Sequence, residues 1–153
     1  MENIERTQEE KYMQQAISQA EQALEAGEGM AFGAVIVQGD KVISAAHNLV
    51  NKDQDPTSHA EVNAIRAACS KLGTWNLEGT TLLSTCEPCP MCFSAAWWAN
   101  ISRIVFGVSL EDVLHVSEEI TVSCAYLNEH GNSKIKLESG FLRDQCLNLY
   151  PQT

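Results

Sequence analysis

The chain has 153 residues, of which 44% are apolar and 20% charged, a composition typical of a folded protein and not of a disordered one. Twenty acidic residues against ten Lys and Arg give a net charge of −10, which disfavours nucleic acid as a partner because phosphate binding needs a basic face. We therefore expect one domain over residues 1–153 and a small, uncharged substrate.

The N-terminal residues Met1 to Arg6 are polar and acidic, and they lack the basic and then apolar order of a signal peptide. No apolar run is long enough to span a bilayer. We therefore expect a cytoplasmic protein without membrane contact. In that compartment thiols stay reduced, so the six cysteines are not expected to form a disulfide framework.

In chain order, the apolar periodicity predicts a first helix over residues 8–26, which ends at Gly27. Two strand-like runs follow at 32–37 and 42–46, joined by a hairpin turn. After a polar loop at 51–56, a second helix is predicted over 58–72, with Gly73 as its stop signal.

The second half of the chain continues the alternation of strands and helices. We predict a strand at 80–84, a helix at 88–100, strands at 103–107 and 134–137, and a closing helix at 140–149. Residues 110–132 show no readable periodicity, and no structure is assigned to them. The alternation predicts an α/β fold, a three-layer α/β/α sandwich around a mixed sheet.

Two short segments carry the chemistry, His59-Ala60-Glu61 and Pro88-Cys89-Pro90-Met91-Cys92, and each opens a predicted helix. Cys89 and Cys92 are three residues apart, so their sulfurs share one helix face. A helix N-terminus also favours thiolates. With His59 they make three ligands for a tetrahedral Zn²⁺ whose fourth position stays open, which is typical of catalytic sites.

Glu61 follows His59 by two residues and is better suited to move protons beside the metal than to bind it. Zinc makes hydroxide available near neutral pH from a water in the open position. Glu61 can take the proton of that water, deliver it to a ring nitrogen and pass one to a departing amine. The order H-x-E followed by P-C-x-x-C is the signature of zinc nucleobase deaminases.

Other interpretations of these residues exist. Taken alone, Cys89 and Cys92 also fit a redox pair, or half of a structural zinc site that Cys86 or Cys69 would complete. A redox pair needs no histidine or glutamate, and a structural site has no use for a proton shuttle. The combination with His59 therefore favours the catalytic interpretation.

These motifs resemble the cytidine deaminase-like superfamily. The resemblance runs from about Gly29 to Gly107 and is strongest over residues 55–62, 64–66 and 86–92. Two branches are most similar, the guanine or guanosine deaminases and the tRNA adenosine deaminases. The resemblance implies a five-stranded central sheet, a homodimer or larger oligomer, and zinc held by His59, Cys89 and Cys92.

The resemblance also implies a set of substrate-binding residues. Asn48, eleven residues before His59, matches an asparagine that hydrogen-bonds the base, although alone it would be interpreted as a turn residue. The aromatic residue before Gly33 and the tryptophan six residues after Cys92 resemble the guanine branch, with core aromatics as the alternative. The expected substrate-binding set is Phe32, Asn48, Ala60, Glu87, Trp98, Glu118 and Glu119.

Three departures bear on the substrate. Ala31 stands where a proline is usual, and the Phe-Asp-Asp segment by which guanine deaminases bind the purine edge is missing. Glu118 and Glu119 are its nearest substitutes, or they are simply solvated. The lysine- and glycine-rich stretch of tRNA enzymes is missing after Gly107.

We therefore predict a zinc-dependent hydrolytic deaminase of a free nucleobase or nucleoside, and first of all a guanine deaminase that converts guanine to xanthine and ammonia. The alternatives are a tRNA adenosine-to-inosine deaminase, or a deaminase of cytosine, a pterin or a triazine. A zinc-stabilised binding subunit without activity is a further alternative, against which the presence of Glu61 argues.

Overall fold

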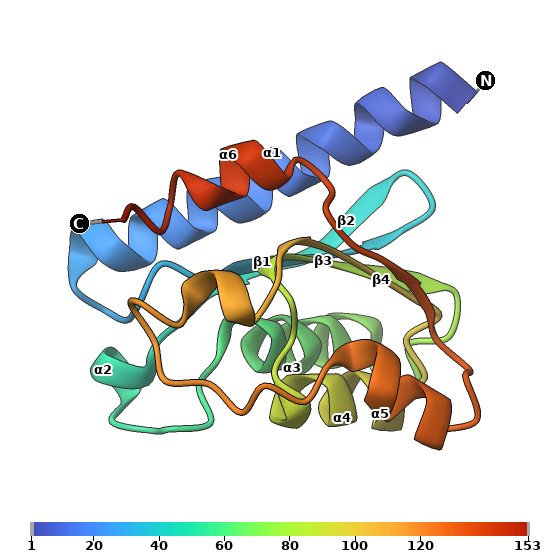
Figure 1. The fold of residues 1–153 in the computed structure, drawn as a ribbon. Coiled ribbons are helices and arrows are strands. Elements are labelled where there is room, and N and C mark those ends of the chain that lie inside the picture. Colours follow the sequence, from blue (N-terminus) through green and yellow to red (C-terminus); the bar gives the residue numbers. More distant parts are fainter. Residues whose placement is uncertain (1, 153) are drawn as a thin grey trace.

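A five-stranded mixed sheet forms the centre of the molecule in the computed structural model, which describes residues 2–152 (Figure 1). Its strand order is β2-β1-β3-β4-β5. β1 pairs antiparallel with β2 and β3, whereas β4 pairs parallel with β3 and β5. The strands are β1 (Gly33–Gln38), β2 (Lys41–His47), β3 (Thr80–Cys86), β4 (Arg103–Val108) and β5 (Lys136–Glu138).

Helices cover both faces of this sheet (Figure 1). On one face lie α1 (Glu2–Ala26) and α6 (Arg143–Leu147); on the other lie α3 (Ala60–Leu72), α4 (Pro90–Trp98) and α5 (Cys124–His130). Successive strand residues point to opposite faces. Accordingly, Val35 packs with the α1 layer, and its neighbours Ala34 and Ile36 pack with the α3 layer. The predicted three-layer α/β/α fold is confirmed.

The first helix lies unusually close to β1. A Cβ atom at Gly33 would overlap the backbone carbonyl oxygen of Ala16, so no side chain fits at this position. Ala16 and Ala20, both fully buried, leave room for that approach. Small residues on both elements therefore set the distance between α1 and the sheet.

Both terminal helices differ from their predicted lengths. α1 begins at Glu2 and not at residue 8, because residues 3–7 are exposed and, apart from Ile4, polar, and therefore leave no apolar periodicity. α6 has only five residues, since Leu142 just before it has a φ of 49°, in the left-handed region. The predicted helix at 140–149 is therefore too long.

The loops contain elements that the sequence pattern did not show. α2 (Val50–Asp53) is a single turn that begins just before the predicted polar loop. The unassigned region 110–132 contains the 3₁₀ turn η1 (Glu111–Val113) and α5. Among the residues described, no helix combines the length and the apolar character needed to cross a membrane.

Candidate active site

His59 occupies the N-cap position of α3, with extended backbone angles that turn the chain into the helix. The preceding residue, Ser58, is fully buried, and its hydroxyl donates to Asp53 Oδ2 at 2.7 Å. Asn63 Nδ2 donates to the backbone oxygens of His47 and Ser58 at 3.1 and 3.3 Å. These contacts tie the start of α3 to the end of β2 and thereby fix the histidine.

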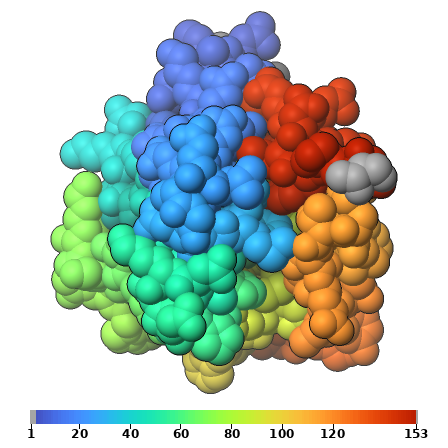
Figure 2. Space-filling view, turned by 90° about the vertical axis from the view of Figure 1, so that its left-hand side faces the viewer, coloured from blue at the N-terminus to red at the C-terminus, as the bar shows by residue number. Residues whose placement is uncertain are grey.

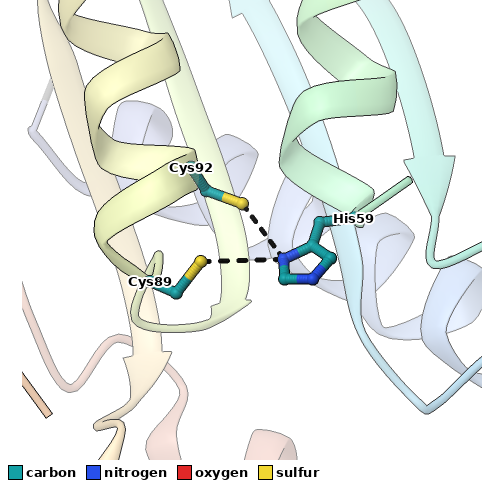
Figure 3. A group of neighbouring side chains, drawn as sticks. All are labelled: His59, Cys89 and Cys92. Carbon is teal, nitrogen blue, oxygen red and sulfur yellow. Dashed lines mark hydrogen bonds between the residues drawn. The ribbon is translucent and has the colours of Figure 1, made fainter. Parts of the chain in front are cut away.

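Cys89 and Cys92 lie at the start of α4. Cys89 is the N-cap, Pro90 begins the helix where a missing N–H costs no hydrogen bond, and Cys92 is one turn further on. The Cys92 side chain is fully buried. Both sulfurs face the neighbouring start of α3 (Figure 3).

The three side chains meet at Nδ1 of His59 (Figure 3). Nδ1 lies 3.6 Å from the Cys89 sulfur and 3.4 Å from the Cys92 sulfur, and all three atoms lie within 4.8 Å of one another. Zinc bonds of about 2.0–2.1 Å to nitrogen and 2.3 Å to sulfur at tetrahedral angles place N and S about 3.6 Å apart. The donor set therefore fits a tetrahedral zinc ion and can hold one.

The electrostatics of the cluster favour a thiolate. The hydrogen bond from Cys92, with a further one from His59, lowers the pKa of Cys89 to about 4 despite burial. The hydrogen bond to Cys89 and burial raise the pKa of Cys92 well above its usual value. The hydrogen bond to Cys89 is also the main cause that raises the pKa of His59. A negative sulfur beside the imidazole is what a cation at this point requires.

Glu61 lies in the first turn of α3, beside His59, and only 6% of its surface is exposed. Burial is the main cause that raises the pKa of this carboxyl to about 7. A group with a pKa near the working pH can both accept and donate a proton.

A cavity of about 280 Å³ opens beside His59, Glu61 and Cys89. It lies at the carboxyl ends of β3 and β4, where Cys86 and Leu110 form part of its wall. Figure 2 shows this side of the molecule, with the green segment that contains α2 and the orange segment around residue 120 separated by yellow-green atoms. Five of the predicted substrate-binding residues line the cavity: Phe32, Asn48, Glu87, Glu118 and Glu119.

Asn48 directly follows β2 and is 5% exposed. Its Oδ1 accepts a hydrogen bond from the Val50 amide at 3.0 Å. A Cβ atom at Gly29 would overlap that same oxygen, so the glycine lets the N-terminal loop close over Asn48. Its side chain therefore has a defined position in the cavity wall, as a base-recognising residue requires.

Glu118 and Glu119 form the opposite wall, on an irregular stretch between η1 and α5. Glu118 is exposed at the rim. Glu119 is partly buried, its Oε1 accepts from the Ser117 hydroxyl at 2.8 Å, and burial raises its pKa. The pair brings carboxylate oxygens to the mouth of the cavity.

Glu87 lies at the cavity wall, but both of its carboxylate oxygens have protein partners. Oε1 accepts from the Leu110 amide at 3.2 Å, and Oε2 accepts from the Cys124 amide at 2.9 Å. Only 6% of its surface is exposed. The carboxylate is thus engaged with the backbone and not free for a substrate.

Two predicted substrate-binding residues lie outside the cavity. Ala60, the first residue of α3, is fully buried in the hydrophobic core. Trp98 is 72% exposed at the end of α4 and contacts Trp97 edge to face. Six residues after Cys92 correspond to about 9 Å along a helix and about 240° around it, so Trp98 points away from the site.

Several cavity residues were missed by the sequence analysis, because most come from loops or a single helical turn, and the two within the matched segments, Pro56 and Cys86, were not assigned to the substrate site. They are Met30, Val50, Asn51, Pro56, Cys86, Leu110 and Ser117. The proximity of the loop at 51–56 to His59 was the available signal. Cys69, Cys86, Cys124 and Cys146 are free thiols and form no metal-binding group among the residues described.

The zinc-binding region of the cytidine and deoxycytidylate deaminase family matches residues 6–108. The chain is 40% identical over 140 residues to the tRNA-specific adenosine deaminase of Bacillus subtilis (strain 168). This match covers 92% of this chain and 84% of that protein. It is 41% identical over 103 residues to the guanine deaminase of the same organism, covering 67% of this chain and 66% of that one.

A solved structure from a study of tRNA:A34 deaminases, which edit A to I at the wobble position, superposes with a TM-score of 0.77. The sequence identity is 28%, and the match covers 90% of this chain and 97% of the other. The fold, the sequence match and the His-Cys-Cys group agree. The chain therefore belongs to the cytidine and deoxycytidylate deaminase family and is a zinc-dependent hydrolytic deaminase.

Proposed function

We propose that this protein deaminates a free purine base, with guanine as the first substrate, at a zinc ion held by His59, Cys89 and Cys92. The observation that carries the substrate class is the charge of the cavity wall. Glu118 and Glu119 line it, and none of the described residues around it is a Lys or Arg. A polyphosphate substrate would meet acid there, whereas ring N–H groups would meet hydrogen-bond acceptors.

The form of the base follows from the same wall. A free purine carries an N–H in its five-membered ring, and this donor is lost when ribose is attached at N9. Guanine additionally carries N1–H, which adenine lacks. Carboxylate oxygens at the rim can accept from such donors, and a site built on such hydrogen bonds rejects analogues without the matching group.

In the proposed reaction, Glu61 moves the protons. Zinc, when bound, supplies a water whose pKa is lowered toward neutrality. The Glu61 carboxylate accepts a proton from the water as the water oxygen bonds to the ring carbon that carries the amine, and it delivers this proton to the adjacent ring nitrogen. A proton then passes through Glu61 to the amine, the C–N bond breaks, and a carbonyl and ammonia result. Asn48 holds the ring against the cavity wall while this occurs.

A second candidate function, deamination of adenosine in tRNA, is favoured by one observation. The match to the tRNA-specific adenosine deaminase of Bacillus subtilis covers 92% of this chain, against 67% for the guanine deaminase. That enzyme class must bind phosphates, which the net charge of −10 disfavours.

Ammonia release with guanine, adenine and guanosine, and inosine formation in an anticodon stem-loop, separate the two functions. We expect guanine to be the best substrate and the stem-loop to be unreactive, with Glu61→Gln as the inactive control. Inosine formation under conditions where guanine releases no ammonia would replace our proposal by the tRNA activity.

We also propose that residues 1–153 act as one domain, as a cytoplasmic homodimer. Six free thiols suit a reducing compartment. Trp98 on α4 and Tyr126 on α5 are exposed to solvent, and a dimer contact at this surface would bury their apolar side chains. Light scattering of the purified protein tests the dimer, and a monomer mass would exclude it.

A further inference from the structure

The segment between Leu110 and Cys124 forms the acidic wall of the cavity. Its first part is held by the ion pair of Asp112 with Arg143 at 2.8 Å and by the hydrogen bond of His115 to the Tyr150 carbonyl oxygen at 2.9 Å. Residues 118–122, which include both wall glutamates, make no hydrogen bond or ion pair to another segment among the residues described. Among the described residues between these two positions, Val113 is the only buried one. Ser117 donates to the side chain of Glu119, a contact within the segment. The part that carries Glu118 and Glu119 therefore takes its position from the held residues before and after it.

Both ends of this segment are held by the residues that immediately precede Cys89. The Glu87 carboxylate accepts from the amide of Leu110 at one end and from that of Cys124 at the other, at 3.2 and 2.9 Å. The Cys124 thiol donates to the Pro88 carbonyl oxygen at 3.2 Å. The Glu87 amide itself donates to Val108 at 2.7 Å. One buried side chain therefore joins the two ends of the wall.

We propose that Glu87 is a positioning residue that sets the acidic wall at a fixed distance from the metal ligands, and thereby determines substrate selection. Glu87 lies two residues before Cys89, so the wall and the metal share one anchor. This inference rests on the proposed function only in that Glu119 contacts the substrate; the anchoring stands without it.

The geometry of the carboxylate makes the role specific. Two acceptor oxygens face two N–H donors, and an amide in place of the carboxylate turns one oxygen into a donor. In Glu87→Gln an amide NH₂ would oppose one backbone N–H, so one end of the wall is released. Because the wall contributes to substrate binding and not to proton transfer, its release raises KM more than it lowers kcat.

Hydrogen exchange measured on zinc-loaded protein tests the anchoring without any substrate. In Glu87→Gln we expect exchange over residues 110–124 to become about tenfold faster, with α1 and the central strands unchanged. The matched control is Glu111→Gln, an exposed acid on the same segment, which should exchange like wild type. Unchanged exchange over 110–124 in Glu87→Gln would overturn the inference.

A second pair of variants removes the donor in place of the acceptor. Cys124 is the first residue of α5, where proline is tolerated. Cys124→Pro deletes the backbone N–H from which the Glu87 carboxylate accepts a hydrogen bond. Cys124→Ala keeps this N–H and removes only the thiol. Faster exchange over 110–123 in Cys124→Pro than in Cys124→Ala supports the anchoring of the segment by Glu87, and equal exchange in the two variants contradicts it. These variants keep the test valid if Glu87→Gln does not fold.

Kinetics on the best substrate then connect the anchor to selection. We expect Glu87→Gln to raise KM about tenfold, with kcat within a few-fold of wild type and zinc retained. In a Glu119→Gln background the same change should have a much smaller effect, because the group it positions is already gone. Additive effects would remove Glu87 from substrate selection. Faster exchange over 110–124 in Glu87→Gln, together with no purine turnover by the wild-type protein, would instead reject the proposed function and leave the anchor in place.

Discussion

The zinc-binding cluster and the acidic wall of the cavity face each other, but the chain holds them in different ways. His59, Cys89 and Cys92 begin two helices that pack on the same face of the central sheet, and Cys92 is fully buried. Glu118 and Glu119 lie on an irregular, largely exposed segment that is held at its two ends. The chemistry thus rests on rigid elements, whereas the proposed selectivity rests on a loop.

The relatives of this chain include a tRNA-specific adenosine deaminase and a guanine deaminase, so one type of reaction serves different substrates among them. A metal site needs its ligand atoms at distances defined to a few tenths of an ångström, which packed helices provide. A substrate wall can change its residues and its path as long as the core is untouched. We therefore expect substitutions in the cluster to abolish activity, and substitutions in the wall to redirect it.

The largest expected effect comes from removing a metal ligand. In Cys89→Ala two ligands remain, so bound zinc should be lost and turnover should fall to background. Elemental analysis together with an ammonia assay measures both. Cys69→Ala, on the far part of α3, is the control and should keep one zinc per chain. Zinc at the wild-type level in Cys89→Ala would exclude Cys89 as a ligand.

The second largest loss of activity is expected when Glu61, the proposed proton shuttle, is replaced. Glu61→Gln preserves shape and burial but cannot carry a proton, so kcat should fall by about 10²–10⁴-fold while zinc and melting temperature stay close to wild type. The rate is measured at saturating substrate, after the zinc content has been matched. Activity within a few-fold of wild type would show that another group transfers the proton.

The third prediction concerns Asn48, a buried residue of the cavity wall whose side chain is fixed by a hydrogen bond to the Val50 amide. Asn48→Ala should lower kcat/KM by about 10- to 100-fold, because a buried hydrogen bond to the base is lost. Steady-state kinetics with guanine measure the change. Asn51→Ala, an exposed asparagine on the same cavity wall, is the matched control with a smaller expected loss. Equal losses in the two variants would argue against a specific role for Asn48.

The acidic wall should show a smaller and selective effect. In Glu119→Gln we expect kcat/KM for guanine to fall about tenfold and that for adenine to change less, since guanine presents the additional N1–H donor. The ratio of the two kcat/KM values is the measurement. Glu118→Gln, at the more exposed rim, should change this ratio less. A ratio that stays constant in Glu119→Gln would exclude this acid from recognition.

The smallest effect is expected at Trp98, which lies away from the cavity. Trp98→Ser should leave kcat/KM within about twofold when the assay is run at a protein concentration that keeps the native oligomer. Analytical ultracentrifugation of the same variant shows whether the exposed indole contributes to association. A tenfold loss of activity in an intact oligomer would restore Trp98 as a substrate-site residue.

Much of this arrangement is predictable from the chain because it is local. The spacing of Cys89 and Cys92, the motif around His59 and Glu61, and the stop at Gly73 each depend on a few consecutive residues. The alternation of apolar strands and helices was enough to predict the layered fold, since strands buried on both faces are continuously apolar. The same periodicity could not show the polar first turns of α1 or the single turn of α2, which have no apolar stripe.

What the sequence determined by itself is therefore the class of chemistry, a zinc-dependent deaminase, and the fold that carries it; the roles of His59, Cys89, Cys92 and Glu61 are its predictions. Only the tertiary structure decided which residues share the cavity. It placed Glu118 and Glu119 in the wall, Ala60 in the core and Trp98 on the surface. It also showed that Glu87 binds the backbone amides of Leu110 and Cys124. The physical reason is that these contacts join segments distant in the chain, and a hydrogen bond to a backbone N–H leaves no trace in the residue that donates it.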